Sequence, residues 1–336
     1  MSFKRFDTED IVISADSITA PAWSNNVTTL TSFFTSADQT ARSSGDYYYN
    51  IYQADPLLDS SAAIQFSIAF GDVDGSGSLA FNSSVTGNSP TSVVYKQLRT
   101  LVNGTEENNL SFAGTTPKSV FAIAVERARF KEKLLPGSLT LTISSGSYTR
   151  TLTDDSIYAP TVVYGDSGRE YNLISGSAGT KYDTLQTDGY TTNSGSYGKF
   201  LPDVGLIVLN GDALSAPAVN GGMAWNIVRG SNTDSKNLDT FSGSLDSFTL
   251  RSEETISSNY VFIRARNSEF NYSTNPSNIT GSGELRHDVM IDSPQSYVTA
   301  VGLYNDNNDL LAVAKLSRPL LKDFTKEALI RIKLDY

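Results

Sequence analysis

The chain of 336 residues contains no cysteine and only one histidine, and both shortages exclude chemistry. Without cysteine the chain can form no disulfide, thiolate zinc site or cysteine nucleophile. Its single histidine, His287, is too few for a histidine metal site, which usually needs more than one such ligand. A serine–histidine–aspartate triad would have to use His287, and no Gly-x-Ser-x-Gly elbow is present to supply the serine. The sequence predicts no cofactor and no metal site.

Basic residues are outnumbered, with 26 Lys and Arg against 36 Asp and Glu, which gives a formal charge of −10. Nucleic-acid binding needs clustered Lys and Arg against the phosphates, so an acidic chain is a poor candidate for it. The densest basic run is Arg127-Ala-Arg-Phe-Lys-Glu-Lys133, which also contains an acid. We interpret this run as a strand with a solvated charged face or as a contact for a protein partner.

Long apolar runs are missing as well. Residues 1–10 lack the apolar core of a signal peptide, and no stretch approaches the roughly 18 apolar residues that cross a membrane. We therefore expect no membrane insertion, and synthesis and assembly in a cytoplasm that the protein leaves by cell lysis.

Aromatic residues and small polar residues are abundant. The chain has 17 Tyr and 16 Phe among long Ser, Thr, Gly and Asn stretches, a composition typical of short strands and many turns. We predict a mainly β fold of antiparallel sheets or β-sandwich-like modules, with long loops, one or two short helices and an extended N-terminal arm. The expected divisions are an arm at 1–45, a β-rich domain with one helix at 46–145, a loop-rich β region or insertion at 146–258 and an antiparallel β module at 259–336.

One helix is predicted over residues 89–102, where apolar residues recur at helical spacing behind Ser89 as N-cap and Pro90. A short helix or a packed arm is expected at Leu30-Thr-Ser-Phe-Phe34. Alternating or continuous apolar runs predict the remaining elements as strands. These strands are expected at residues 46–52, 63–70, 119–129, 137–143, 161–164 and 204–209.

The last third has the clearest pattern. Residues 259–266 alternate between two faces, and 328–336 places Ala328, Ile330 and Ile332 opposite Arg331 and Lys333. Residues 297–304 and 310–316 flank the cluster Asn305-Asp-Asn-Asn-Asp309, which predicts a hairpin because Asn and Asp tolerate positive φ. The end of the chain is therefore expected to belong to a sheet.

Enzymatic motifs are weak. Asp72-Val-Asp-Gly-Ser-Gly77 places acids at the first and third positions of a calcium loop, but Ser83 stands where a bidentate Glu is needed, which favours a Gly/Ser turn. The doublets Asp154-Asp155 and Glu253-Glu254 are adjacent in sequence and so tend to point apart, unlike a glycosidase pair. We predict that the protein is not an enzyme.

Five segments carry a resemblance to a known family. They are Met1-Ser-Phe-Lys-Arg-Phe-Asp-Thr-Glu-Asp-Ile-Val12, Phe121-Ala-Ile-Ala-Val-Glu-Arg-Ala-Arg-Phe-Lys-Glu-Lys-Leu-Leu-Pro-Gly137, Tyr197-Gly-Lys-Phe-Leu-Pro-Asp-Val-Gly205, Glu269-Phe-Asn-Tyr-Ser-Thr-Asn-Pro276 and residues 294–336. They resemble virion structural proteins of contractile-tailed cyanophages, which are myophages. The resemblance implies a viral tail protein, with the baseplate as its expected location. More loosely, residues 301–316 and 330–334 resemble the C-terminal hairpin of phage tail-collar fibre proteins.

Residues and resemblance together predict a structural subunit of the virion, assembled in the host cytoplasm through contacts with other tail or baseplate subunits in several copies. Residues 1–45 are expected to pack partly on a neighbour. The candidate assembly contacts are Phe3, Phe6, Phe33, Phe34, Arg127, Arg129, Lys131, Tyr304, Arg331 and Lys333.

Two alternatives remain open. The first is a receptor- or glycan-binding tail module, in which tyrosines stack on sugars. Its candidate residues are Tyr48, Tyr49, Tyr158, Tyr164, Tyr171, Tyr182 and Tyr190. Against it, tyrosine is a common half-buried strand residue. The second is a polysaccharide-degrading tail enzyme.

Overall fold

The computed structural model describes residues 4–36, 48–78, 81–82, 84, 89–159, 161–182, 188–230 and 236–335. It is mainly β, with 45% strand and 14% helical residues, in large antiparallel sheets of which one is a curled half-barrel. This confirms the predicted fold class. The chain divides into two compact units, here called unit 1 (Met1–Ser17 and Thr255–Tyr336) and unit 2 (Ile18–Glu254). The expected division at 258 lies four residues from the one after Glu254, the expected division at 145 falls inside unit 2, and the one at 45 lies outside the described residues.

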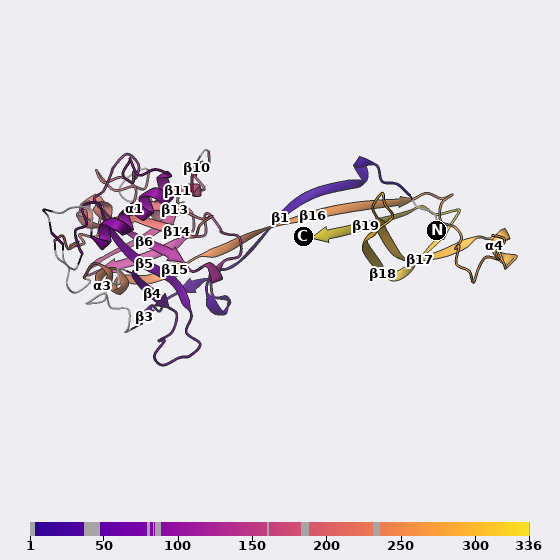
Figure 1. Ribbon diagram of the computed structural model, residues 1–336, viewed down its shortest axis with the longest axis horizontal. Helices are drawn as coiled ribbons and strands as arrows, with labels where there is room; N and C mark the ends of the chain where they lie inside the picture. The colour runs from indigo at the N-terminus through magenta and orange to yellow at the C-terminus, as the bar shows by residue number, and fades with distance from the viewer. Residues whose placement is uncertain are drawn as a thin grey trace. The chain divides into compact units, whose positions relative to one another are not determined.

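Unit 2 is built on one large sheet, with strand order β2-β15-β8-β9-β11-β13-β14-β6-β5-β4-β3 and with β10 and β12 paired to β11 (Figure 1). Its strands are β2 (Thr29–Leu30), β3 (Phe34–Thr35), β4 (Tyr48–Tyr52), β5 (Ile64–Asp72), β6 (Ser119–Val125), β8 (Thr140–Ser145), β9 (Tyr148–Asp154), β10 (Val163–Gly165), β11 (Gly168–Ser177), β12 (Thr180–Lys181), β13 (Gly198–Leu201), β14 (Leu206–Asn210) and β15 (Leu245–Thr249). The short strand β7 (Lys133–Leu134) pairs instead with the first residues of β16.

Both faces of the middle of this sheet are buried. On β6, Phe121 and Ile123 join the main core, whereas Val120 and Ala122 point to the opposite face. That second face is covered by helix α1 (Pro90–Asn103), whose Tyr95 is buried there. This explains why strands such as β6 and β14 have nearly continuous apolar sequences instead of alternating ones.

Helix α1 confirms the predicted helix, but its start differs in one detail. Ser89 occupies the N-cap position, yet its hydroxyl donates to the carbonyl of Gly75 and makes no capping bond. The helix ends at Gly104, which has a positive φ of 67° that glycine adopts without strain. The other described helices are α2 (Gly211–Ser215), α3 (Lys236–Gly243) and α4 (Val289–Asp292).

Two local predictions are wrong. The strand expected over residues 119–129 ends at Val125, and Arg127–Arg129 forms a 3-10 turn. The helix or arm expected at residues 30–34 is instead part of the sheet, because Leu30 in β2 is buried in the main core of unit 2. The N-terminal segment is extended, as predicted, but it packs on its own chain: the Lys4 ammonium lies 3.2 Å from a Glu269 carboxylate oxygen, Ile11–Pro21 pairs with β16, and Ala22 joins the main core.

Unit 1 contains a two-stranded ribbon and most of a four-stranded sheet. The sheet has the order β1-β16-β19, with β7 of unit 2 paired to β16, and the ribbon pairs β17 with β18. The strands are β1 (Ile11–Pro21), β16 (Arg251–Ala265), β17 (Gln295–Tyr304), β18 (Leu310–Asp323) and β19 (Ala328–Asp335), of which β1 and β16 extend beyond the unit. The predicted hairpin is confirmed, and Asn308 in its turn has a φ of 67°.

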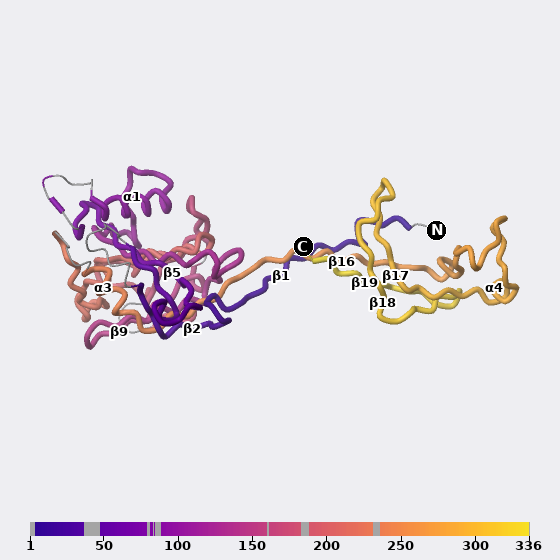
Figure 2. The backbone as a smooth tube through the Cα atoms, turned by 60° about the horizontal axis from the view of Figure 1, so that its bottom comes forward, coloured from indigo at the N-terminus to yellow at the C-terminus, as the bar shows by residue number. Residues whose placement is uncertain are grey.

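Buried and exposed side chains alternate along the strands of unit 1 as their sequences predict. Val261 on β16 and Ile332 on β19 pair with each other across the two strands and are buried, together with Leu303 of the ribbon. The ribbon therefore packs one face against the sheet, as Figure 2 shows for β17 and β18 beside β16 and β19. Arg331 and Lys333 lie on the opposite, exposed face of the sheet.

Candidate assembly surface

Unit 1 has a small core and an apolar exterior. Among its described residues, the buried apolar side chains are Val261, Ala265, Leu303, Ala328 and Ile332. The exposed large apolar side chains are Phe6, Ile11, Val12, Ile13, Tyr272, Val289, Ile291, Tyr297, Tyr304, Leu310, Leu311, Val313, Phe324 and Leu329. A segment of this size usually buries most of its apolar side chains, and contiguous apolar patches mark interaction sites. Unit 1 is therefore the candidate assembly surface.

The exposed face of the sheet formed by β1, β16 and β19 carries an aromatic side chain, Tyr260, close to two cations. The Arg331 guanidinium lies 5.7 Å and the Lys333 ammonium 5.8 Å from the ring centroid of Tyr260. Lys333 also lies 3.1 Å from a carboxylate oxygen of Asp335 and 3.7 Å from one of Asp16 on β1. The hydrogen bond with Asp335 raises the pKa of Lys333 and keeps it charged. The structure thus brings the two predicted contacts Arg331 and Lys333 together.

The ribbon has an outer face on which apolar side chains are exposed. We define the ribbon outer face as Ala300, Gly302, Tyr304, Leu310, Val313 and Lys315, to which the bulged residue Leu311 is adjacent. Gly302 pairs with Val313 and Tyr304 pairs with Leu310. Val313 is 60% exposed and Leu310 is 53% exposed. The predicted contact Tyr304 belongs to this face.

The sheet of unit 1 also has open edges. Within the described residues, β1 and β19 each pair on one side only, with β16. Every β1 residue in unit 1 is exposed or half-buried, including Ile11, Val12 and Ile13. An edge strand with unpaired backbone groups and apolar side chains is a template for another chain.

The other predicted contacts are divided between surface and core. Phe6 and Phe34 are 38% and 39% exposed. Phe33 packs against the core of unit 2, with its ring centroid 6.2 Å from that of Phe66, so it already has a partner in the chain. Phe3 lies outside the described residues.

The basic run is partly engaged within unit 2. The Arg127 guanidinium lies 4.6 Å from the ring centroid of Phe130 and donates to its carbonyl, and Arg129 donates to the Ser24 hydroxyl. The Lys131 ammonium lies 2.7 Å from a carboxylate oxygen of Glu254, and the Lys131 side chain is 78% exposed. Of this run, Lys131 is the residue most open to a partner.

A buried lysine in unit 1 was not predicted from the sequence. Lys322 of β18 is fully buried, and its ammonium donates to the side-chain carbonyl of Asn271 at 2.7 Å and to the backbone carbonyls of Asn267 and Asp323 at 3.1 and 3.0 Å. These three acceptors use its three donors. The contacts fasten the loop after β16 to the ribbon. The surrounding Leu-Leu-Lys-Asp sequence contains no signal for them.

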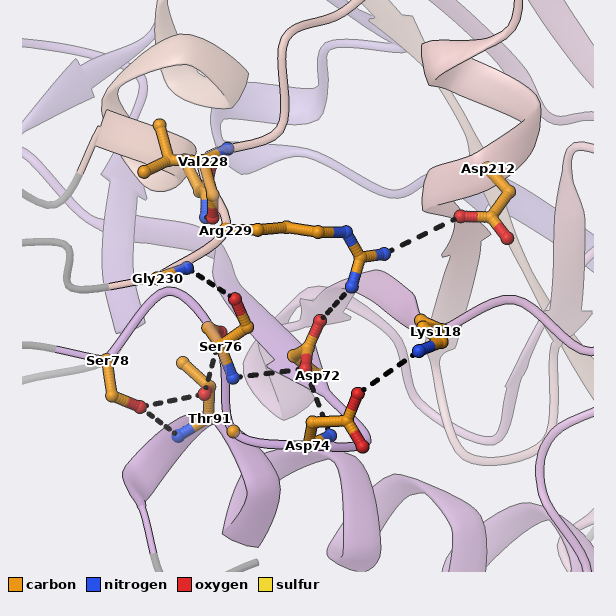
Figure 3. Close-up of polar contacts among 12 residues, drawn as sticks. Asp72, Asp74, Ser76, Ser78, Thr91, Lys118, Asp212, Val228, Arg229 and Gly230 are labelled. Atoms are coloured by element: carbon orange, nitrogen blue, oxygen red, sulfur yellow. Dashed lines mark hydrogen bonds and ion pairs between the residues drawn. The ribbon is translucent and has the colours of Figure 1, made fainter. Parts of the chain in front are cut away.

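The calcium-like loop of unit 2 is a turn (Figure 3). The Asp72 carboxylate is fully buried and accepts the N–H groups of Asp74 and Ser76 at 3.0 Å each and an Arg229 N–H at 3.0 Å. Burial raises the pKa of the Asp72 carboxyl, although Arg229 opposes the shift. The Asp74 carboxylate lies 3.4 Å from the Lys118 ammonium. The aspartates of the loop therefore face protein donors.

The remaining sequence candidates for chemistry lie apart. Asp154 accepts the N–H of Gly137, whereas Asp155 accepts that of Asn172, so this doublet does not form one site. His287 is exposed. Among the residues that the structure describes, no group of three or more histidine and acidic side chains could hold a metal ion. The described helices include none that is both long and apolar enough to cross a membrane.

The tyrosines proposed for glycan contact differ in exposure. Tyr49 and Tyr171 are buried in the core. Burial raises the pKa of Tyr190 to about 12. Tyr164 is 72% exposed, and Lys181 lies over the ring of Tyr158, 5.0 Å from its centroid. Of the seven candidate tyrosines, the exposed ones are Tyr48, Tyr158, Tyr164 and Tyr182.

Comparisons of this chain with protein-family models, curated proteins and solved structures find no match.

Proposed function

We propose that this protein is a structural subunit of a bacteriophage tail, located at the baseplate, which acts through protein–protein contacts in virion assembly and has no enzymatic activity. The subunit is assembled in the host cytoplasm in several copies. The placement in a tail rests on the resemblance of residues 1–12, 121–137, 197–205, 269–276 and 294–336 to cyanophage structural proteins.

The observation that carries the assembly role is the imbalance in unit 1, where five apolar side chains are buried and fourteen large ones are exposed among the described residues. Burial of apolar surface is the main favourable contribution to both folding and association. A unit that buries so little in its own chain gains this stabilisation when neighbouring subunits cover it.

The residue types on the surface support the same role. Interfaces are enriched in Tyr and Arg and carry charges at their rims. The exposed face of the sheet has Tyr260 beneath Arg331 and Lys333, with Asp16 and Asp335 beside them. Such a face offers an aromatic anchor and charged groups of both signs to a neighbour.

Incorporation of variants into particles tests the proposal. Leu329 in unit 1 and Leu57 in unit 2 are both 68% exposed, so they form a matched pair. Phages carrying Leu329→Asp are expected to contain at least tenfold less of this chain, by quantitative mass spectrometry of purified particles. Phages carrying Leu57→Asp should contain normal amounts. Absence of the wild-type chain from purified particles would overturn the proposal.

A receptor- or glycan-binding tail module is the second candidate, favoured by the exposure of Tyr164 and Tyr158 in unit 2. Exposed tyrosine rings stack on sugar faces. Binding of the isolated chain to a glycan array, lost in Tyr164→Ala, would favour this candidate.

A further inference from the structure

We propose that the ribbon outer face binds the same face of a second copy of this chain across a two-fold axis. The inference deepens the proposed assembly function, on which its place in the virion rests, by naming one partner of unit 1.

The sequence of β18 predicts a strand that is covered on both of its faces. Leu310-Leu-Ala-Val-Ala-Lys-Leu316 is almost continuously apolar, a pattern typical of strands covered on two sides. The chain itself covers one side, where Ala312 and Ala314 pack with Leu303 against the sheet. Val313 remains 60% exposed on the other side. In the proposed dimer, the second copy supplies the other cover.

The geometry of the outer face suits packing against another sheet. Between Lys315 at one end and Tyr304 at the other, its residues are apolar or glycine. A β-carbon built on Gly302 would lie 2.9 Å from Cε2 of Tyr304 and 3.3 Å from Cδ1 of Leu310. These two side chains therefore fold down over the glycine. Two sheets that pack face to face approach to about 10 Å and bury such side chains between them.

Charges at the two ends of the ribbon outer face identify the partner as a second copy. Asp306 and Asp309 lie in the turn beyond Tyr304 and Leu310, and Lys315, which pairs with Ala300, lies at the other end of the face, all three exposed. A two-fold axis near Val313 places the acidic end of each copy beside the basic end of the other. The face is thus complementary to itself, as a two-fold interface requires.

The charge of each unit agrees with contact through unit 1. Unit 1 has 11 Lys and Arg against 13 Asp and Glu, a net charge of −2, whereas unit 2 carries −8. Two copies repel each other least through the unit that is closest to neutral. A strongly basic or strongly acidic partner would match only one end of the ribbon outer face.

Sedimentation equilibrium of the full-length chain at micromolar concentration tests the inference. The wild-type protein should have twice the 36.3 kDa mass of one chain. Val313→Asp should raise the dimer dissociation constant at least tenfold. The matched control Val219→Asp, at a position 78% exposed in unit 2, should leave it unchanged.

Charge exchange tests the two-fold arrangement and does not depend on an apolar substitution. Lys315→Asp and Asp306→Lys should each weaken the dimer, and the double variant should restore it because the ends again carry opposite charges. Restored association also shows that these chains fold.

Three results would overturn the inference: a monomeric wild-type protein, equal effects of Val313→Asp and Val219→Asp, or no restoration in the double variant. A wild-type chain that is monomeric in solution but present in purified particles would remove self-association and leave the proposed function standing. A stable dimer that is absent from particles would remove the proposed function and leave self-association standing.

Discussion

The ring of Tyr304 lies over Gly302 on the ribbon outer face, where a β-carbon at residue 302 would come within 2.9 Å of the ring. The two residues are on one strand, two positions apart, so their side chains point to the same side of the ribbon. The absence of a side chain at residue 302 lets the ring lie close to the backbone. This contact sets the shape of the surface that a neighbour would meet.

Gly302→Ala is expected to change association without changing the stability of the isolated chain. The new methyl group would displace the Tyr304 ring, which is 38% exposed. Gly302 has no positive φ, so alanine is tolerated by the backbone. We expect an unchanged melting temperature by circular dichroism and a several-fold weaker dimer by sedimentation. A large loss of melting temperature with unchanged association would contradict this account of the surface.

The buried Lys322 predicts a local loss of stability when its side-chain acceptor is removed. Asn271→Leu takes away the carbonyl 2.7 Å from the ammonium and leaves a buried cation with one acceptor fewer. A hydrogen bond to a charged group is worth about 1.5–3 kcal/mol, and we expect a loss of that size in urea denaturation. Asn267→Ala is the matched control, because Asn267 contributes only its backbone carbonyl to Lys322. Equal losses for the two variants would show that the contact is unimportant.

The ion pair of Arg169 and Asp203 predicts a pH dependence for unit 2. Arg169 donates through Nη2 to Oδ1 of Asp203 at 2.6 Å and through its backbone N–H to Oδ2 at 2.7 Å. Partial burial alone would raise the pKa of the Asp203 carboxyl, but the hydrogen bonds and charge of Arg169 outweigh it and hold the pKa below the ordinary value of 3.8. Such a group stabilises the fold above its unfolded pKa, and the contribution is lost as the pH falls through the lowered folded pKa.

Asp203→Asn should therefore cost about 1 kcal/mol at neutral pH, a value reduced by solvent screening. The difference from wild type should shrink steadily as the pH falls below 3.8. Denaturant titrations at neutral pH and below pH 3.8 measure this difference, with Asp246→Asn as a control at an exposed position of β15. A cost that is independent of pH would rule out the ion pair as its source.

A larger loss of stability is expected when an aromatic side chain in the core of unit 2 is truncated. Phe241 of α3 is fully buried and stacks on Phe121 of β6, with ring centroids 5.1 Å apart. Phe241→Ala should destabilise the protein by about 3–5 kcal/mol because it leaves a cavity. Thr240→Ala on the exposed side of the same helix should cost little. A loss under 1 kcal/mol for Phe241→Ala, roughly the size of a surface change, would mean that α3 is not packed as described.

Patterns within a few residues predicted much of unit 1. The alternation of Ile330, Arg331 and Ile332 gave both faces of β19, and the Asn/Asp cluster before Leu310 gave the turn of the ribbon. Both signals are local, since strand periodicity and turn chemistry depend on neighbouring residues.

Features that depend on distant residues could not be predicted. Leu30 belongs to the core because β2 pairs with Phe248, more than 200 residues away. Lys322 is buried because a loop from before the ribbon brings Asn271 to it. Arg331 and Lys333 were named as contacts from the pattern of β19 alone, and their shared position over Tyr260 depends on pairing with β16.

A cryo-EM reconstruction of the purified particle, with this chain traced into density, tests the proposed assembly role most directly. The account predicts that the chain lies at the baseplate, with Tyr260, Leu329 and Val313 of unit 1 covered by other chains, one of them a second copy. Density in which these three side chains face solvent, or a particle that lacks the chain, would contradict it.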